Sequence, residues 1–214
     1  MQDLSLAPPL PLRWDPEGNP DRARRRRIGD IELRDCALDR FNSVLAITDI
    51  GHRRLCADQI ATAARNLFTE PQLPIPPCIY DRLRATALLR RMTRDGDWQP
   101  DPAAAECVER LLQYFADSDV LIPHQAPVVG HFDDAILVDA AWPQLAHESA
   151  CYQDYRRVRR AEAELRGADP SRMGFKRDDW LAAREAADRL MQRFRGQGYE
   201  SYRLSYGGAP FRVH

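Results

Sequence analysis

The sequence lacks the cysteine pairs and the long apolar runs that mark several common classes of protein. None of its cysteines forms a CxxC pair, which excludes a zinc ribbon and a thioredoxin-type redox site. No run approaches the ~18 apolar residues that a membrane-spanning helix needs. Residues 1–12 contain prolines and no basic segment, so we expect no signal peptide. The five cysteines are odd in number and widely spaced, which favours a reducing compartment: Cys36, Cys56, Cys78, Cys107 and Cys151. We therefore predict a cytoplasmic protein, with any membrane contact peripheral.

The short motifs of familiar active sites are also missing. The sequence has no glycine-rich phosphate loop, no nucleophile elbow, no HExxH helix and no internal repeat. The net charge of −1 over 214 residues gives the whole chain no general attraction for nucleic acid or anionic lipid. The arginines within residues 156–160 fit a solvated helix face, so we expect no sequence-specific nucleic-acid partner.

Apolar residues recur at helical spacing through most of the chain, and strand signals are nearly absent. This pattern predicts an all-α fold, an irregular or orthogonal bundle of about six to seven helices over residues 30–196. Residues 1–29 are rich in proline and charge and predict a flexible N-terminal arm. Residues 197–214 predict an extended C-terminal tail.

Capping residues and prolines set the expected ends of the helices. Asp30 is a plausible N-cap for a helix to about Ile47, and Asp101 followed by Pro102 is a strong helix start. We expect Pro143 to break or kink the chain between a short helix, 133–142, and a longer one, 144–166. The remaining helices are expected after Gly51, over 79–92 and over 177–195, the last burying Trp180, Ala183, Ala187, Leu190 and Phe194.

Charge is unevenly distributed along the chain. Residues 111–155 contain no lysine or arginine but include seven acids: Asp117, Asp119, Asp133, Asp134, Asp139, Glu148 and Asp154. Three of the five histidines, His124, His131 and His147, lie in the same window. Residues 156–195 carry an excess of basic residues. We therefore expect an acidic lobe beside a basic helical face.

Within this window the spacing Pro-x3-Pro-x2-Gly-x2-Asp-Asp stands out. It is formed by Pro123, Pro127, Gly130, Asp133 and Asp134, after Ile122 and before an aliphatic run. Residues 119–142, within a segment of about 111–150, resemble the signature of the YkvA-like family. That family is a bacterial domain of unknown function, also found in some eukaryotic membrane-bound RING proteins. The resemblance implies a helical fold and brings no established activity.

The residues of this loop allow two interpretations. In the structural one, the prolines fix an extended entry, Gly130 permits a tight turn or close backbone approach, and Asp133 or Asp134 caps the next helix. In the functional one, His131, Asp133 and Asp134 bind a divalent metal, joined by His124, His147 or Glu148. Adjacent aspartates with histidines suit a hydrolase or a metal sensor.

Three functions remain open on the sequence alone. The leading hypothesis is a YkvA-like helical interaction or regulatory module without catalysis and without a cofactor, acting on an unknown protein partner. The alternative is a metal-dependent hydrolase that uses the Asp-Asp/His site with a divalent metal. A second alternative is peripheral membrane association through the apolar loop, suggested by the family's membrane-anchored relatives.

Overall fold

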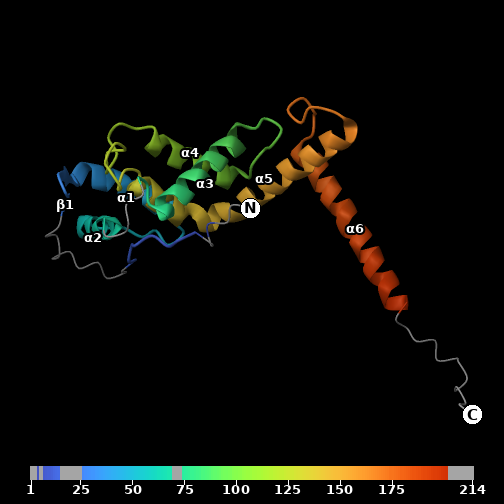
Figure 1. Ribbon diagram of the computed structural model, residues 1–214, viewed down its shortest axis with the longest axis horizontal. Helices are drawn as coiled ribbons and strands as arrows, with labels where there is room; N and C mark the ends of the chain where they lie inside the picture. The colour runs from blue at the N-terminus through green and yellow to red at the C-terminus, as the bar shows by residue number, and fades with distance from the viewer. Residues whose placement is uncertain (1–3, 5–6, 15–25, 69–73, 202–214) are drawn as a thin grey trace, which may run out of the picture. The chain divides into compact units, whose positions relative to one another are not determined.

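The computed structural model describes residues 4, 7–14, 26–68 and 74–201 (Figure 1). These residues form six helices and one two-stranded sheet, which confirms the all-α prediction. The chain divides into two compact units, residues 1–156 and 157–214. The elements are β1 (Arg27–Ile28), β2 (Ile31–Glu32), α1 (Asp35–Thr48), α2 (Ala57–Leu67), α3 (Pro77–Arg94), α4 (Pro102–Phe115), α5 (Phe132–Arg166) and α6 (Arg177–Ser201). No helix in these described ranges is both long and apolar enough to cross a membrane.

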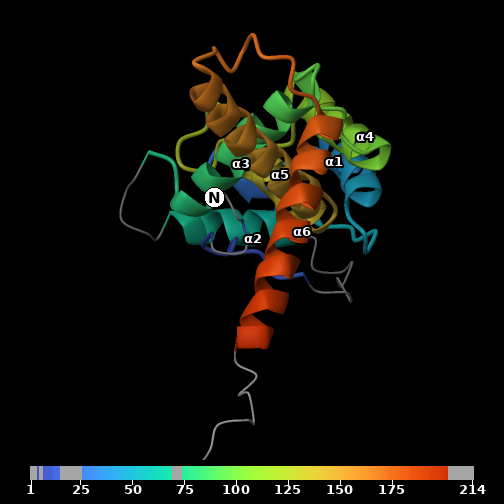
Figure 2. The same cartoon turned by 90° about the vertical axis from the view of Figure 1, so that its right-hand side faces the viewer.

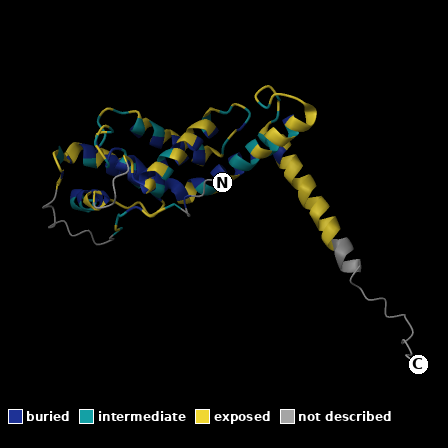
Figure 3. Cartoon of the chain, in the orientation of Figure 1, coloured by how far each residue is buried: buried dark blue, intermediate teal, exposed yellow. Residues whose placement is uncertain are grey.

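The first part of α5 is the centre of the first unit. Its residues 135–138 are fully buried, and Figure 3 shows this stretch almost continuously dark. Polar side chains tie it to its neighbours: Gln144 donates to the carbonyl of Thr48 at the end of α1, and the Tyr152 hydroxyl donates to Asp95 after α3. Figures 1 and 2 show α1, α3 and α4 arranged around this part of α5. A run of small and aliphatic residues without a polar face is typical of a helix buried on all sides.

The N-terminal end of the bundle differs from the prediction. Asp30 does not cap a helix; it lies in the turn of a hairpin, and α1 begins at Asp35 after the N-cap residue Arg34. Ile28 pairs with Ile31, and Gly29 has a positive φ of 58°, the left-handed conformation that glycine adopts without strain. Two isoleucines separated by Gly-Asp are a recognised hairpin signal, which our helix assignment overlooked.

The described part of the predicted N-terminal arm packs on the bundle. Leu10 is buried, and Ile28, at the end of the arm, is buried in β1. The carbonyl of Pro8 accepts a hydrogen bond from Arg82 of α3. Residues 15–25 of the arm lie outside the described residues.

Pro143 does not interrupt α5, which contradicts the predicted break. The helix is continuous from Phe132 to Arg166 with Pro143 inside it. An internal proline costs roughly 3 kcal/mol because it removes one backbone hydrogen bond and crowds the preceding turn. Contacts on both sides offset this cost: Asp139 pairs with Arg82 before the proline, and Gln144 bonds to α1 after it.

In the second unit, α6 differs from the prediction in two respects. It continues to Ser201 rather than ending near Arg195, so the predicted tail begins inside a helix. Trp180 is buried, but the other expected core residues of this helix are exposed: Ala183, Ala187, Leu190 and Phe194 (Figure 3). The remainder of the tail, residues 202–214, lies outside the described residues.

The predicted start of α4 is confirmed in detail and can be tested. The Asp101 carboxylate accepts from the amides of Ala103 and Ala104, and Pro102 occupies the first helical position. Replacing Asp101 with alanine should lower the free energy of unfolding by about 1 kcal/mol, measured by urea denaturation. Asp101→Asn is the matched control and should be nearly neutral, because asparagine caps almost as well. Equal losses in the two variants would contradict the capping role.

Candidate functional site

The loop between α4 and α5 turns its apolar residues inward. Leu121, Ile122 and Val129 are buried, whereas Pro123 and Pro127 are exposed. Two turn hydrogen bonds shape the loop. The amide of Ala126 donates to the Pro123 carbonyl, and the amide of Val129 donates to the Pro127 carbonyl. The larger apolar side chains of the loop therefore pack on the bundle, and the two prolines remain on its surface.

Gly130 allows the close backbone approach that the sequence predicts. A Cβ at this position would lie 2.7 Å from the Ala126 carbonyl oxygen and closer still to that of His124. No real side chain tolerates such contacts with backbone atoms. Glycine therefore lets the loop fold back on itself and brings residue 124 beside residue 131.

Two residues of the loop adopt left-handed backbone conformations that are unusual for them. Val128 and His131 both have φ of 66°. A β-branched residue in this region is a genuine outlier, and such a conformation costs on the order of 1–3 kcal/mol. The surrounding structure must compensate for this strain.

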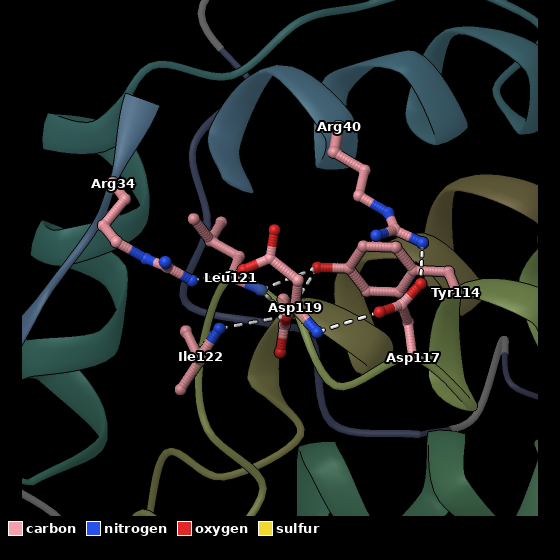
Figure 4. A network of polar contacts seen from close by, with 8 residues as sticks. Arg34, Arg40, Tyr114, Asp117, Asp119, Leu121 and Ile122 are labelled. Atoms are coloured by element: carbon pink, nitrogen blue, oxygen red, sulfur yellow. Dashed lines mark hydrogen bonds and ion pairs between the residues drawn. The ribbon is translucent and has the colours of Figure 1, made fainter. Parts of the chain in front are cut away.

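Asp133 anchors the start of this loop and is completely buried in the first turn of α5. Its Oδ2 atom accepts from the Tyr114 hydroxyl at 2.7 Å, from the Leu121 amide at 3.1 Å and from the Ile122 amide at 3.2 Å. Figure 4 shows these donors converging from α4 and from the start of the loop. The carboxylate thus holds the loop against the bundle.

Arginines from the α1 region neutralise the acids at the start of the loop. Arg40 pairs with Asp117 and Arg34, just before α1, pairs with Asp119 (Figure 4). Hydrogen bonds from the backbone amide of Asp119 and from Arg40 lower the pKa of the Asp117 carboxyl. Together with the Arg82–Asp139 pair, these contacts pair three of the seven acids of the predicted acidic lobe with arginines of the fold.

Next to this network, two histidines converge on the neighbouring carboxylate. The imidazole rings of His124 and His131 stack, with centroids 4.0 Å apart and an interplanar angle of 21°. Nδ1 of His131 lies 2.7 Å from Oδ2 of Asp134, and Nε2 of His124 lies 3.3 Å from the same oxygen. One possible ligand atom from each of the three residues falls within 4.8 Å of the others.

This cluster combines a buried carboxylate with half-buried imidazoles. The Asp134 side chain is only 3% exposed, against 31% for His124 and 33% for His131. Among the described residues, Oδ1 of Asp134, Oδ1 of Asp133 and Nε2 of His124 are buried and make no hydrogen bond, although Nε2 of His124 lies 3.3 Å from Oδ2 of Asp134. A buried polar atom without a partner is costly and calls for an explanation, such as an ion.

Burial also shifts the protonation of the cluster. Desolvation, with repulsion from Asp133 second, raises the pKa of Asp134 to about 7. Desolvation raises the pKa of the Asp133 carboxyl as well, against the hydrogen bond from Tyr114. Burial lowers the pKa of His131, so its imidazole is neutral near pH 7. A neutral imidazole is the form that binds a metal.

The structure regroups the residues that the sequence singled out. Asp133 is turned away from the histidines and holds the loop, whereas His124 joins His131 and Asp134. His147 and Glu148 are not brought to the site, because the continuous α5 places them about 20 Å along the helix axis at 1.5 Å per residue. Instead, Glu148 accepts from the amide of Asp101 at the start of α4.

The predicted capping role of the two aspartates is also wrong. An N-cap side chain accepts from amides two or three residues ahead of it. The donors to Asp133 in the loop lie eleven and twelve residues behind it, and Asp134 pairs with a histidine three residues behind. Both carboxylates still lie in the first turn of α5, where negative charge interacts favourably with the helix dipole.

Tyr114 is the functional residue that the sequence analysis missed. It lies on the buried face of α4, where periodicity alone indicates an ordinary core position. Its hydroxyl donates to Asp133 and accepts from the Leu121 amide at 3.0 Å. A buried tyrosine needs a partner for its hydroxyl, and that need was the available signal.

Comparisons of the chain with protein-family models, with curated proteins and with solved structures find no match. The resemblance to the YkvA-like signature therefore rests on the loop residues alone. The function must be argued from the geometry of the site.

The loop network predicts an ordered series of stabilities. Asp133→Ala leaves the buried Ile122 amide and the Tyr114 hydroxyl without an acceptor, at ~1–3 kcal/mol each, and should lower the free energy of unfolding by about 3 kcal/mol. Asp133→Asn retains an acceptor oxygen, so its free energy of unfolding should fall by less than that of Asp133→Ala. Tyr114→Phe should lower the free energy of unfolding by about 1–2 kcal/mol. Asp119→Ala, which breaks an exposed ion pair, is the control and should lose less than ~1 kcal/mol. An Asp133→Ala loss no larger than that of Asp119→Ala would refute the network. Chemical denaturation measures all four.

Proposed function

We propose that this chain is a metal-binding regulatory module that holds a divalent transition metal on His124, His131 and Asp134. The observation that carries the proposal is the convergence of two imidazoles on one buried carboxylate with unpartnered atoms. Two histidines and one carboxylate suit zinc or iron(II), since imidazole prefers such metals and Mg²⁺ prefers oxygen ligands.

The regulatory part of the proposal follows from where the ligands are attached. His124 belongs to the loop, whereas Asp134 belongs to the rigid start of α5. A metal that joins them fixes the loop and its exposed prolines, Pro123 and Pro127, in one conformation. The loop surface would then differ between the loaded and empty protein, and a protein partner in the cytoplasm would read that difference.

A metal-dependent hydrolase is the second candidate function, and one observation favours it. Three protein ligands leave at least one coordination position open, and both histidines are partly exposed to solvent. A metal with an open position activates a bound water as a nucleophile. Hydrolysis of simple phosphate or carboxylate esters by the zinc-loaded protein, lost in His124→Gln, would replace the regulatory proposal with this one.

Metal binding should raise the melting temperature of the wild type. Zinc at one hundred times its dissociation constant adds ~2.7 kcal/mol of stability, which corresponds to a rise of about 5–10 °C for a chain of this size. His124→Gln, His131→Gln and Asp134→Asn should each lose most of this rise. His147→Gln is the matched control, because His147 lies on the same helix outside the cluster, beside Cys151. Thermal scans and elemental analysis of the dialysed protein measure the effect. If the zinc-induced rise in melting temperature survives in Asp134→Asn but disappears in His147→Gln, the metal binds at His147 and not at the proposed cluster.

The same site should bind metal more weakly in acid. The raised pKa of about 7 means that Asp134 is largely protonated at pH 6 and ionised at pH 8. Without metal, the raised pKa makes the free energy of unfolding depend on pH. The contribution of Asp134 to this free energy is fully present below its unfolded pKa near 3.8 and is lost as the pH rises through about 7. A metal binds the ionised form and releases the proton, so the zinc-induced rise in melting temperature should be larger at pH 8 than at pH 6. A rise independent of pH over this range would contradict the assignment of Asp134 as a ligand.

A further inference from the structure

The N-terminal segment of residues 7–14, here termed the strap, packs on a surface of the first unit that is formed by α2, α3 and the turn after α1 and is here termed the groove. Leu10 is buried to 9% exposure, whereas the side chains of Pro8, Pro9 and Arg13 are exposed. The strap belongs to the chain's blue end in Figure 1. It is thus an extended segment held on a folded surface rather than an element of the bundle.

The groove presents hydrogen-bond donors to the strap's backbone carbonyls. Nη1 of Arg82 donates to the Pro8 carbonyl at 2.9 Å, and Nε2 of Gln59 donates to the Arg13 carbonyl at 3.4 Å. The guanidinium of Arg53 lies over the Trp14 ring, 3.8 Å from its centroid. These side chains come from α2, α3 and the turn after α1.

Such donors match the chemistry of a proline-rich peptide. Proline has no amide hydrogen, and a residue that precedes proline favours extended conformations. A segment such as Ala-Pro-Pro-Leu-Pro-Leu, residues 7–12, therefore offers carbonyl acceptors and few donors. Grooves that recognise proline-rich segments exploit this low-entropy, extended backbone.

The groove is organised independently of the strap. The Arg82 side chain is only 3% exposed and is fixed by Asp139 and by the Cys78 carbonyl, to which Nη1 donates at 2.8 Å. Arg53 is fixed by Asp49, with 2.8 Å between Nη2 and Oδ1. The donors would therefore keep their positions if the strap left.

The strap itself forms most of the wall of a partly open pocket of about 320 Å³. Five strap residues line it together with Leu4, Arg82 and Asp139: Ala7, Pro9, Leu10, Leu12 and Trp14. The Arg82–Asp139 pair is the part of this pocket that belongs to the bundle, and it faces the apolar side of the strap.

We propose that this groove is a recognition site for an extended proline-rich peptide of a partner protein, which competes with the strap. The recognised sequence resembles the strap: a proline whose carbonyl accepts from Arg82, a Leu-Pro pair at the buried position, and an aromatic residue for Arg53. The strap is tethered through residues 15–25, so its effective concentration is high and it weakens binding in trans.

The test uses the full-length chain and a labelled peptide with the sequence of residues 7–14. Leu10→Asp places a charge at the strap's buried position and should release it. By fluorescence anisotropy, the peptide should bind Leu10→Asp at least tenfold more tightly than the wild type. Arg13→Asp is the matched control, because it places an aspartate at an exposed side chain of the same strap, and it should bind like the wild type although its charge change is the larger one. A peptide carrying the same Leu→Asp change should not bind either protein.

Each other outcome counts against the proposal. If Leu10→Asp unfolds or loses its cooperative transition, the strap is part of the core and the groove is not a separate site. Circular dichroism shows whether the Leu10→Asp variant folds. If it folds but does not bind the peptide even at millimolar concentration, the strap only packs on the bundle and the groove is not a recognition site. A wild-type dimer that dissociates in Leu10→Asp would overturn the partner assignment, since a second copy would then supply the segment. None of these outcomes tests the His124–His131–Asp134 cluster, because the cluster shares no residue with the groove.

Discussion

The buried carboxylate of Asp133 is the interaction on which the arrangement of the first unit depends. One oxygen takes three donors, two from the backbone of the loop and one from Tyr114. Removing such an acceptor leaves buried donors unsatisfied, and this penalty far exceeds the value of one hydrogen bond. The carboxylate therefore fixes where the loop begins. The close backbone approach at Gly130 and the contact with Asp134 then place His124 beside the start of α5.

The three aspartates at the start of α5 each anchor a different segment. Asp133 holds the loop, Asp134 meets the two histidines, and Asp139 fixes Arg82, which in turn contacts the strap. The concentration of acids that the sequence displays is thus explained by internal contacts rather than by an acidic outer surface. Because α5 is buried and continuous, these anchors have fixed relative positions, and the loop and the strap are both oriented by one helix.

Sequence reasoning succeeded where the signal was local and failed where tertiary contacts decided. The start of α4 was predictable because Asp101 and Pro102 act on the amides beside them. Pro143 was misjudged because its local cost is outweighed by contacts from α1 and α3, which no pattern in α5 reveals. The sequence named His131, Asp133 and Asp134 as candidate ligands, with His124, His147 and Glu148 as further ones. The fold groups His124, His131 and Asp134, and periodicity does not reveal which aspartate faces the histidines. Adjacent helical residues point in directions about 100° apart, and only the fold decides between them.

The division of roles between the two adjacent aspartates has an electrostatic consequence. Two neighbouring buried carboxylates repel, and repulsion from Asp133 contributes to the raised pKa of Asp134. Each of the two carboxylates has its Oδ1 atom buried without a hydrogen-bond partner. Oδ2 of Asp133 takes three donors, whereas Oδ2 of Asp134 faces the two imidazoles. Near neutral pH the fold must either place a proton on this pair or supply a positive charge. In the site that we propose, a divalent cation between the imidazoles and Asp134 would supply that charge, whereas a proton on Asp134 would remove the need for it. Asp134 rather than Asp133 would then be the carboxylate ligand, because Asp134 groups with both histidines.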